Sequence, residues 1–128
     1  PGTQVYNNTI VMDNSFPRAI EYRFAVTTGV LIANNLTNKP IVSRNGASGV
    51  VSKNVTNAVG SWFVNPARGD LHLASAIGSV VGAGQIVAGL SDDFDGQPRT
   101  ASIDVGADQL VARSARPDSA NPRLVVPR

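Results

Sequence analysis

Residues 6–10 read YNNTI, and related stretches return as ANNLTN at 33–38 and SKNVTN at 52–57. The second asparagine of each of the first two stretches, Asn8 and Asn35, and the first asparagine of the third, Asn54, are separated by 27 and then 19 positions. Each polar stretch lies between short Val/Ile-rich runs of the kind that form strands. This loose period predicts one small structural unit that is used several times.

Stacked parallel strands explain why asparagine recurs. Successive coils of such a stack lie about 4.8 Å apart, so identical amides can bond to one another in a ladder. Asparagine also tolerates the left-handed backbone that a sharp corner requires. We therefore interpret Asn8, Asn35 and Asn54 as structural corner residues. The N-x-[ST] triplets that begin at Asn7, Asn35 and Asn54 allow a second interpretation, N-glycosylation, which a ladder would prevent.

Composition favours one all-β domain. The chain has 128 residues, of which 42% are hydrophobic and 5% aromatic, and it contains 12 glycines. This is enough for one modest core built from strands and turns. The chain has no cysteine, which excludes disulfides and thiolate metal sites. We expect an all-β solenoid.

The charges are uneven along the chain. Residues 1–110 hold seven Lys/Arg against eight Asp/Glu, whereas residues 111–128 hold four arginines against one aspartate. We interpret 111–128 as a Pro/Arg-rich flexible tail or linker, and nucleic acid is not an expected partner. No apolar run approaches the roughly 20 residues that span a bilayer, so no membrane partner is expected either.

The pattern changes after residue 60, where glycine and alanine become frequent. Pro66 and Gly69 predict a turn, and three glycines within the run LHLASAIGSVVGAG argue against a long helix. We expect residues 60–110 to form an irregular cap over the last coil, so that residues 1–110 comprise the terminal coils and their cap.

This second half resembles the C-terminal end of right-handed parallel β-helix proteins of the pectate-lyase-like superfamily. The resemblance rests on NPARGDLHLASAIGSVVGAG (65–84), DDFDGQPR (92–99) and IDVGADQ (103–109), and it extends over about residues 5–110. It implies structural roles for the following residues of these motifs: Asp95, Gly96, Arg99, Asp104 and Gly106.

Two features depart from the resemblance. Gln109 stands where the family has glutamate, and the chain has only two or three coils where such proteins have many. Because the sequence also begins with Pro1 rather than methionine, we expect it to be the last portion of a longer protein. Its partner would then be the missing N-terminal coils or another chain.

The DDFDG stretch raises the question of calcium. Asp93 and Asp95 have the Asp-x-Asp spacing, followed by Gly96, that suits a loop of oxygen ligands. In the alternative interpretation both aspartates cap the turn and pair with Arg99, while Gly96 supplies a positive φ.

The resemblance implies carbohydrate chemistry. Lyases of this superfamily use a cation and a basic side chain, and glycosidases of the same fold use two carboxylates. The weak catalytic candidates are Arg18, Glu21 and Arg23, but they also fit a solvated outer face, and no convincing catalytic constellation is present. His72, the single histidine, is expected to be a hydrogen-bonded structural residue.

The sequence thus predicts the C-terminal portion of an extracellular or cell-surface bacterial β-helix protein. It would act on polysaccharide as a lyase or glycosidase, and this portion would serve as a cap and as part of the sugar groove. The alternative is a structural or adhesive surface module without enzymatic activity. Fold alone does not decide between them.

Overall fold

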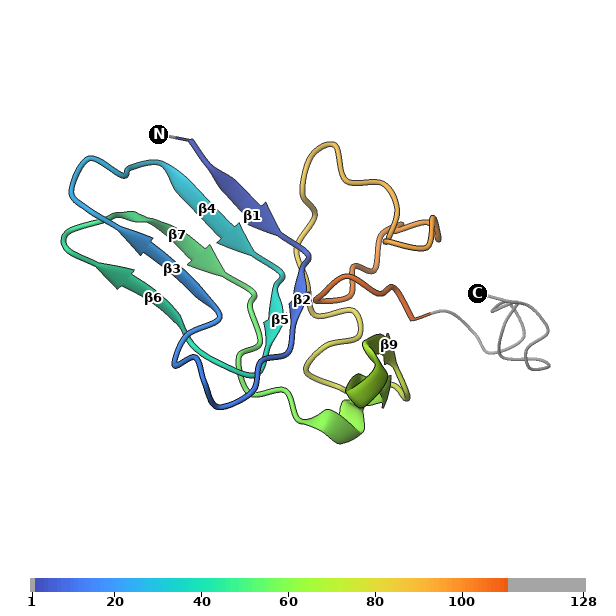
Figure 1. The fold of residues 1–128 in the computed structure, drawn as a ribbon. Helices are drawn as coiled ribbons and strands as arrows, with labels where there is room; N and C mark the ends of the chain where they lie inside the picture. The colour runs from blue at the N-terminus through green and yellow to red at the C-terminus, as the bar shows by residue number, and fades with distance from the viewer. Residues whose placement is uncertain (1, 111–128) are drawn as a thin grey trace.

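The computed structural model describes residues 2–110 and shows an all-β chain (Figure 1). The predicted tail, 111–128, lies outside the described residues. Two short 3-10 turns, η1 (Gly60–Trp62) and η2 (Pro66–Arg68), accompany the strands. The strands are β1 (Gln4–Tyr6), β2 (Thr9–Ile10), β3 (Ile20–Arg23), β4 (Val30–Ala33), β5 (Leu36–Thr37), β6 (Ile41–Arg44), β7 (Gly49–Ser52), β8 (Phe63–Asn65) and β9 (Asp70–Leu73).

No helix within residues 2–110 has the length and apolar character that crossing a membrane requires.

The first seven strands pair in parallel, in the order in which the chain meets them. β1, β4 and β7 form one sheet, β2 pairs with β5, and β3 pairs with β6. After β7, Val55 forms a further parallel bridge to Leu36 of β5. The chain therefore returns to the same positions. We call β1 to β3 the first pass and β4 to β6 the second, and β7 begins the third; each pass lies beside the one before it (Figure 1).

Amide side chains connect these passes. Asn8 Nδ2 donates to Asn35 Oδ1 at 2.9 Å, and Asn35 Nδ2 donates to Asn54 Oδ1 at the same distance. The backbone N–H groups of Asn8 and Asn35 donate to the same two oxygens, at 3.1 and 2.8 Å. The recurring asparagines thus stack in the ladder that their spacing suggests.

At each corner the residue with the left-handed backbone is not the ladder residue but the residue before it. The positive φ angles are 54° at Asn7, 59° at Asn34 and 58° at Lys53, one position before each ladder residue. The expectation that one asparagine both turns the chain and stacks is therefore wrong. The residue before it makes the bend, and the ladder residue then directs its amide along the stack. Asn34 Nδ2 adds a second contact between passes, to Asn7 Oδ1 at 3.0 Å.

The C-terminal half contains one antiparallel pair, β8 with β9, and is otherwise irregular. Its first turn follows the sequence: Pro66 begins η2, and Gly69 ends it with a left-handed φ of 80°. The segment 103–110 lies along the corners of the passes, close to β2 and β5 (Figure 1). The main hydrophobic core joins β5 to the C-terminal half, and its buried members are Leu36, Ala58, Phe63, Leu73, Val80 and Val105.

The last strand of the three-stranded sheet, β7, has exposed side chains. Val50 and Val51 of β7 are 60% and 45% exposed, so the described residues leave the last strand of the sheet largely open. The segment 103–110 lies against the corners, where it provides partners for their buried amides and carbonyls. Asn7 Nδ2 donates to the carbonyls of Asp104 and Gly106, at 3.0 and 3.1 Å.

Replacement of the middle ladder residue should destabilise the protein more than replacement of the first. Asn35 is fully buried, and Asn35→Ala leaves several buried backbone and amide groups without a partner, at roughly 1–3 kcal/mol for each such group. We expect a loss of about 2–4 kcal/mol in the free energy of unfolding for Asn35→Ala. Urea titration followed by the fluorescence of Trp62 measures it.

Asn8→Ala is the matched control. Asn8 is exposed, and its loss should cost less than about 1 kcal/mol. Equal losses for the two variants would show that the ladder does not stabilise the passes.

Candidate functional site

The predicted catalytic candidates meet in an exposed ion-pair cluster on β3 and β6. Glu21 accepts a hydrogen bond of 3.0 Å from Arg44, and its carboxylate lies 3.5 Å from Arg18 Nε and 3.8 Å from Arg23 Nε. The bond from Arg44 lowers the pKa of the Glu21 carboxyl, with further lowering by the charges of Arg23 and Arg18. A general acid at neutral pH needs the opposite shift.

Arg44 was not recognised from the sequence as a member of this cluster. It is the register partner of Arg23 in the parallel pair β3–β6, so the two guanidinium groups lie on adjacent strands. Beside them, Arg23 Cζ lies 5.0 Å from the ring centroid of Phe24, which is 54% exposed. The cluster is an outward-facing surface with three arginines and one carboxylate.

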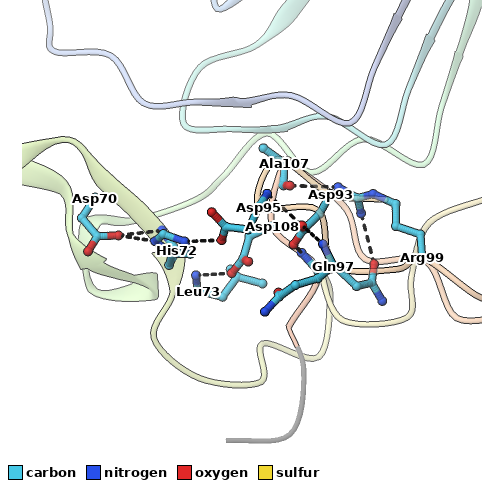
Figure 2. A network of polar contacts seen from close by, with 10 residues as sticks. Asp70, His72, Leu73, Asp93, Asp95, Gln97, Arg99, Ala107 and Asp108 are labelled. Carbon is cyan, nitrogen blue, oxygen red and sulfur yellow. Dashed lines mark hydrogen bonds and ion pairs between the residues drawn. The ribbon is translucent and has the colours of Figure 1, made fainter. Parts of the chain in front are cut away.

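A second polar network is buried in the C-terminal segment (Figure 2). The Arg99 guanidinium donates to the carbonyls of Asp92, Asp104, Gly106 and Ala107, and to Gln109 Oε1 at 3.1 Å. Burial lowers the pKa of Arg99, while nearby aspartates, Asp93 foremost, act in the opposite direction. Arg99 therefore ties separate turns together through their carbonyl groups.

Asp93 and Asp95, the pair whose spacing suggested calcium, have different hydrogen-bond partners. Asp93 Oδ1 accepts the N–H groups of Asp95 and Gln97, at 2.9 and 2.8 Å, and its Oδ2 accepts that of Gln109 at 2.9 Å. Its oxygens are committed to the turn, and Gly96 has the expected positive φ of 82°. Asp95 Oδ2 lies instead 2.6 Å from His72 Nε2. The interpretation of a turn-capping aspartate fits Asp93, whereas Arg99 bonds to carbonyls rather than to either carboxylate.

Asp104 and Gly106 hold the segment against the passes. The two carboxylate oxygens of Asp104 accept the N–H groups of Gly82 and Leu110, at 2.8 and 2.7 Å. Burial raises the pKa of this carboxyl in spite of those bonds. Gly106 has a φ of 99°, and an added Cβ would lie 2.7 Å from Thr9 Oγ1. The position therefore requires glycine.

His72 lies between two carboxylates (Figure 2). Its Nδ1 is 2.6 Å from Asp70 Oδ1, and its Nε2 is 2.6 Å from Asp95 Oδ2. The residue is 7% exposed, and its ring lies against Phe94, with 4.9 Å between ring centroids. A surface pocket of about 500 Å³ borders it, lined by Thr9, Arg68, Gly69, Asp70, Leu71, His72, Phe94 and Ala107.

A third carboxylate completes this group. One oxygen of Asp108, one of Asp95 and one ring nitrogen of His72 all lie within 4.8 Å of one another. Asp108 Oδ2 also accepts the Leu73 N–H at 2.8 Å, which fixes its orientation. An imidazole and two carboxylates at this separation are a possible set of ligands for a divalent metal ion.

Sequence reasoning missed this group, although part of the signal was present. Asp70 and His72 are two positions apart on a strand and therefore share a face, which the pattern Asp-x-His could have shown. The contributions of Asp95 and Asp108 depend on how distant turns pack, and no local pattern predicts them. His72 is hydrogen-bonded as expected, but its partners are acidic.

Comparisons of the chain with family models, curated proteins and solved structures found no match.

The Arg99 network predicts that lysine cannot replace arginine. A lysine ammonium has three donors at one point and cannot reach carbonyls that are spread around a planar guanidinium. We expect Arg99→Lys to lower the free energy of unfolding by roughly 2–4 kcal/mol, through buried acceptors that lose their donor. Arg68→Lys, at an exposed position, should change it little. Equal stability of Arg99→Lys and wild type in urea would contradict this role.

Because the pKa of Asp104 is raised, the difference in the free energy of unfolding between wild type and Asp104→Asn should depend on pH. The folded protein binds this proton more tightly than the unfolded chain, so the stabilisation present in acid is lost as the pH rises through the raised value. The deficit of Asp104→Asn should therefore be largest in acid and shrink towards neutral pH. Urea titrations of both proteins between about pH 4 and 7 measure it.

Asp13 supplies the comparison of opposite sign. Its carboxylate accepts the Ser15 N–H at 2.8 Å, which lowers its pKa. Any deficit of Asp13→Asn should therefore grow, not shrink, as the pH rises through the usual range of aspartate, and it should stay constant above that range. The same trend in both variants would contradict the assignment for Asp104.

Proposed function

We propose that this chain is the C-terminal portion of a right-handed parallel β-helix protein of the pectate-lyase-like kind, located outside a bacterial cell and active on polysaccharide. The proposal is supported by three parallel strand pairings that recur in the same order and by the amide ladder that crosses them. In such a protein the passes would be the final coils, and residues 60–110 would cover their corners.

The first pass supplies the argument for a partner. β1, β2 and β3 each pair on one side only, among the described residues. In the ladder, the side-chain oxygen of Asn35 accepts hydrogen bonds from Asn8, which lies in the preceding pass, and that of Asn54 accepts them from Asn35. Asn8 Oδ1 thus has no equivalent donor within residues 2–110. An upstream coil of the same protein would supply both that donor and the missing strand neighbours.

The arginine surface on β3 and β6 is the single observation that favours an acidic sugar. Three guanidinium groups surround one carboxylate, so the cluster carries a local excess of positive charge. Arg23 and Arg44 lie on neighbouring strands, a spacing of about 4.8 Å. Guanidinium groups bind sugar carboxylates in a bidentate manner, and the exposed Phe24 ring offers a flat apolar face for a sugar.

The alternative, an adhesive or structural module without turnover, is favoured by the state of Glu21. It is the only glutamate in the chain, and three arginines hold its carboxyl in the ionised form with a lowered pKa. A carboxyl with a lowered pKa is poorly suited to the role of the general acid of a glycosidase. Catalytic groups, if the whole protein has them, would then lie on upstream coils.

Binding to polygalacturonate tests the proposal. We expect the chain to bind this acidic polymer but not neutral dextran, with an affinity that falls as salt is added. The double variant Arg23→Gln/Arg44→Gln should bind at least about tenfold more weakly, because two charge-assisted contacts are lost. Isothermal titration calorimetry measures both affinities.

Lys53→Asn is the matched control, because it removes an exposed positive charge away from the cluster and asparagine suits the left-handed backbone at that position. An equal loss in Lys53→Asn would assign the binding to net charge rather than to this surface. Activity is scored separately on the longest available protein, by ultraviolet absorbance of unsaturated uronides and by new reducing ends. Binding without either product supports the adhesive alternative.

A further inference from the structure

The His72 group is a second polar site, independent of the arginine surface. It joins three parts of the C-terminal half: β9 carries Asp70 and His72, the turn after residue 91 carries Asp95, and the segment 103–110 carries Asp108 (Figure 2). These parts are distant in sequence. Their polar side chains nevertheless converge at one point beside the surface pocket.

The two short contacts of the ring require a positive charge at this point. A neutral imidazole has one N–H and one lone pair, so only one of its nitrogens can donate to a carboxylate. With the proton on Nδ1 towards Asp70, the lone pair of Nε2 faces the Asp95 oxygen at 2.6 Å. That arrangement is repulsive unless a second proton or a metal ion lies between the two atoms.

The surroundings favour a metal ion. A metal-bound histidine commonly donates its other N–H to a carboxylate, which fixes the ring and raises its basicity, and Asp70 occupies that position. Asp108 is 2% exposed, and its backbone bond from Leu73 points its carboxylate into the group. The Phe94 ring shields one side of the imidazole.

We propose that His72 Nε2 and the carboxylates of Asp95 and Asp108 bind a divalent first-row transition metal, Zn²⁺ or a close relative, with Asp70 as the positioning residue. Insertion of the ion widens the contact between His72 and Asp95 from 2.6 Å to about 3 Å or more, the separation of two ligands that each bond at roughly 2.0–2.2 Å. The adjoining pocket leaves room for water as a further ligand.

The ligand set also distinguishes this ion from calcium. Ca²⁺ takes six to eight oxygen ligands, whereas an imidazole nitrogen suits zinc, copper, iron or nickel. The site thus replaces the calcium loop suggested by the Asp93 and Asp95 spacing. A bound metal would join the β8–β9 hairpin to the turn and to the segment along the corners.

Calorimetric titration of the chelator-treated protein with Zn²⁺, and separately with Ca²⁺, tests the proposal. We expect one Zn²⁺ per chain, a melting temperature that rises with Zn²⁺, and no corresponding response to Ca²⁺. Asp95→Asn should bind Zn²⁺ at least about tenfold more weakly. Its amide can still donate to the Nε2 lone pair, so the contact with His72 and the fold are retained.

Asp92→Asn is the control, because it removes a carboxylate from the same exposed turn but lies outside the set of ligands. It should leave the affinity for Zn²⁺ within about twofold of wild type. Asp70→Asn should weaken binding by about 10- to 100-fold while Zn²⁺ remains bound one to one, as expected for a positioning residue.

Three results would overturn the proposal. One is a wild-type protein that binds no Zn²⁺, in which case a shared proton explains the short contact. The second is an equal loss of affinity in Asp92→Asn and Asp95→Asn, which would indicate non-specific binding to surface carboxylates. The third is folded Asp95→Asn with unchanged affinity. The wild-type measurement does not depend on whether any variant folds.

Discussion

The contact on which the rest of the structure depends is the bond between asparagine amides of successive passes. Asn35 is fully buried and bonds both to Asn8 before it and to Asn54 after it. An amide carries two donors and an acceptor with two lone pairs, so it can bond along the stack and still serve the backbone on either side. Because the same residue type recurs, the corners at Asn8 and Asn35 make the same pair of bonds to the next pass, and the adjoining strands pair in parallel register.

The C-terminal half depends on these corners in turn. The corner residues Asn7 and Asn34 have left-handed φ angles, and they bond to segments far along the chain: Asn7 to the carbonyls of Asp104 and Gly106, Asn34 to Gln85. Arg99 then gathers the carbonyls of the same segment from the other side. The irregular half is therefore ordered by a buried hydrogen-bond network where regular strands are absent.

The arginine surface and the His72 group differ in burial, and burial determines what each can do. The arginines around Glu21 are about 40% exposed, so water and salt screen them, and their pairing adds little stability. They remain available to an external anion. His72 and Asp108 are nearly covered, so water and salt screen an interaction with a charge at this position much less. The first group suits a polymer that approaches from solvent, and the second suits a small ion.

The sequence by itself determined the all-β class, the period of the asparagine corners and the turns at Gly69 and Gly96, because these follow from the backbone preferences and spacing of nearby residues. It did not separate the bend at Asn7 from the ladder at Asn8, since asparagine suits both roles. Tertiary structure alone decided that residues 60–110 lie along the corners, that Arg99 bonds to carbonyls rather than carboxylates, and that Asp95 meets His72. Several of those contacts join residues 22 or more positions apart. The others depend on which buried polar groups come together when the chain packs, and the local sequence pattern does not specify this.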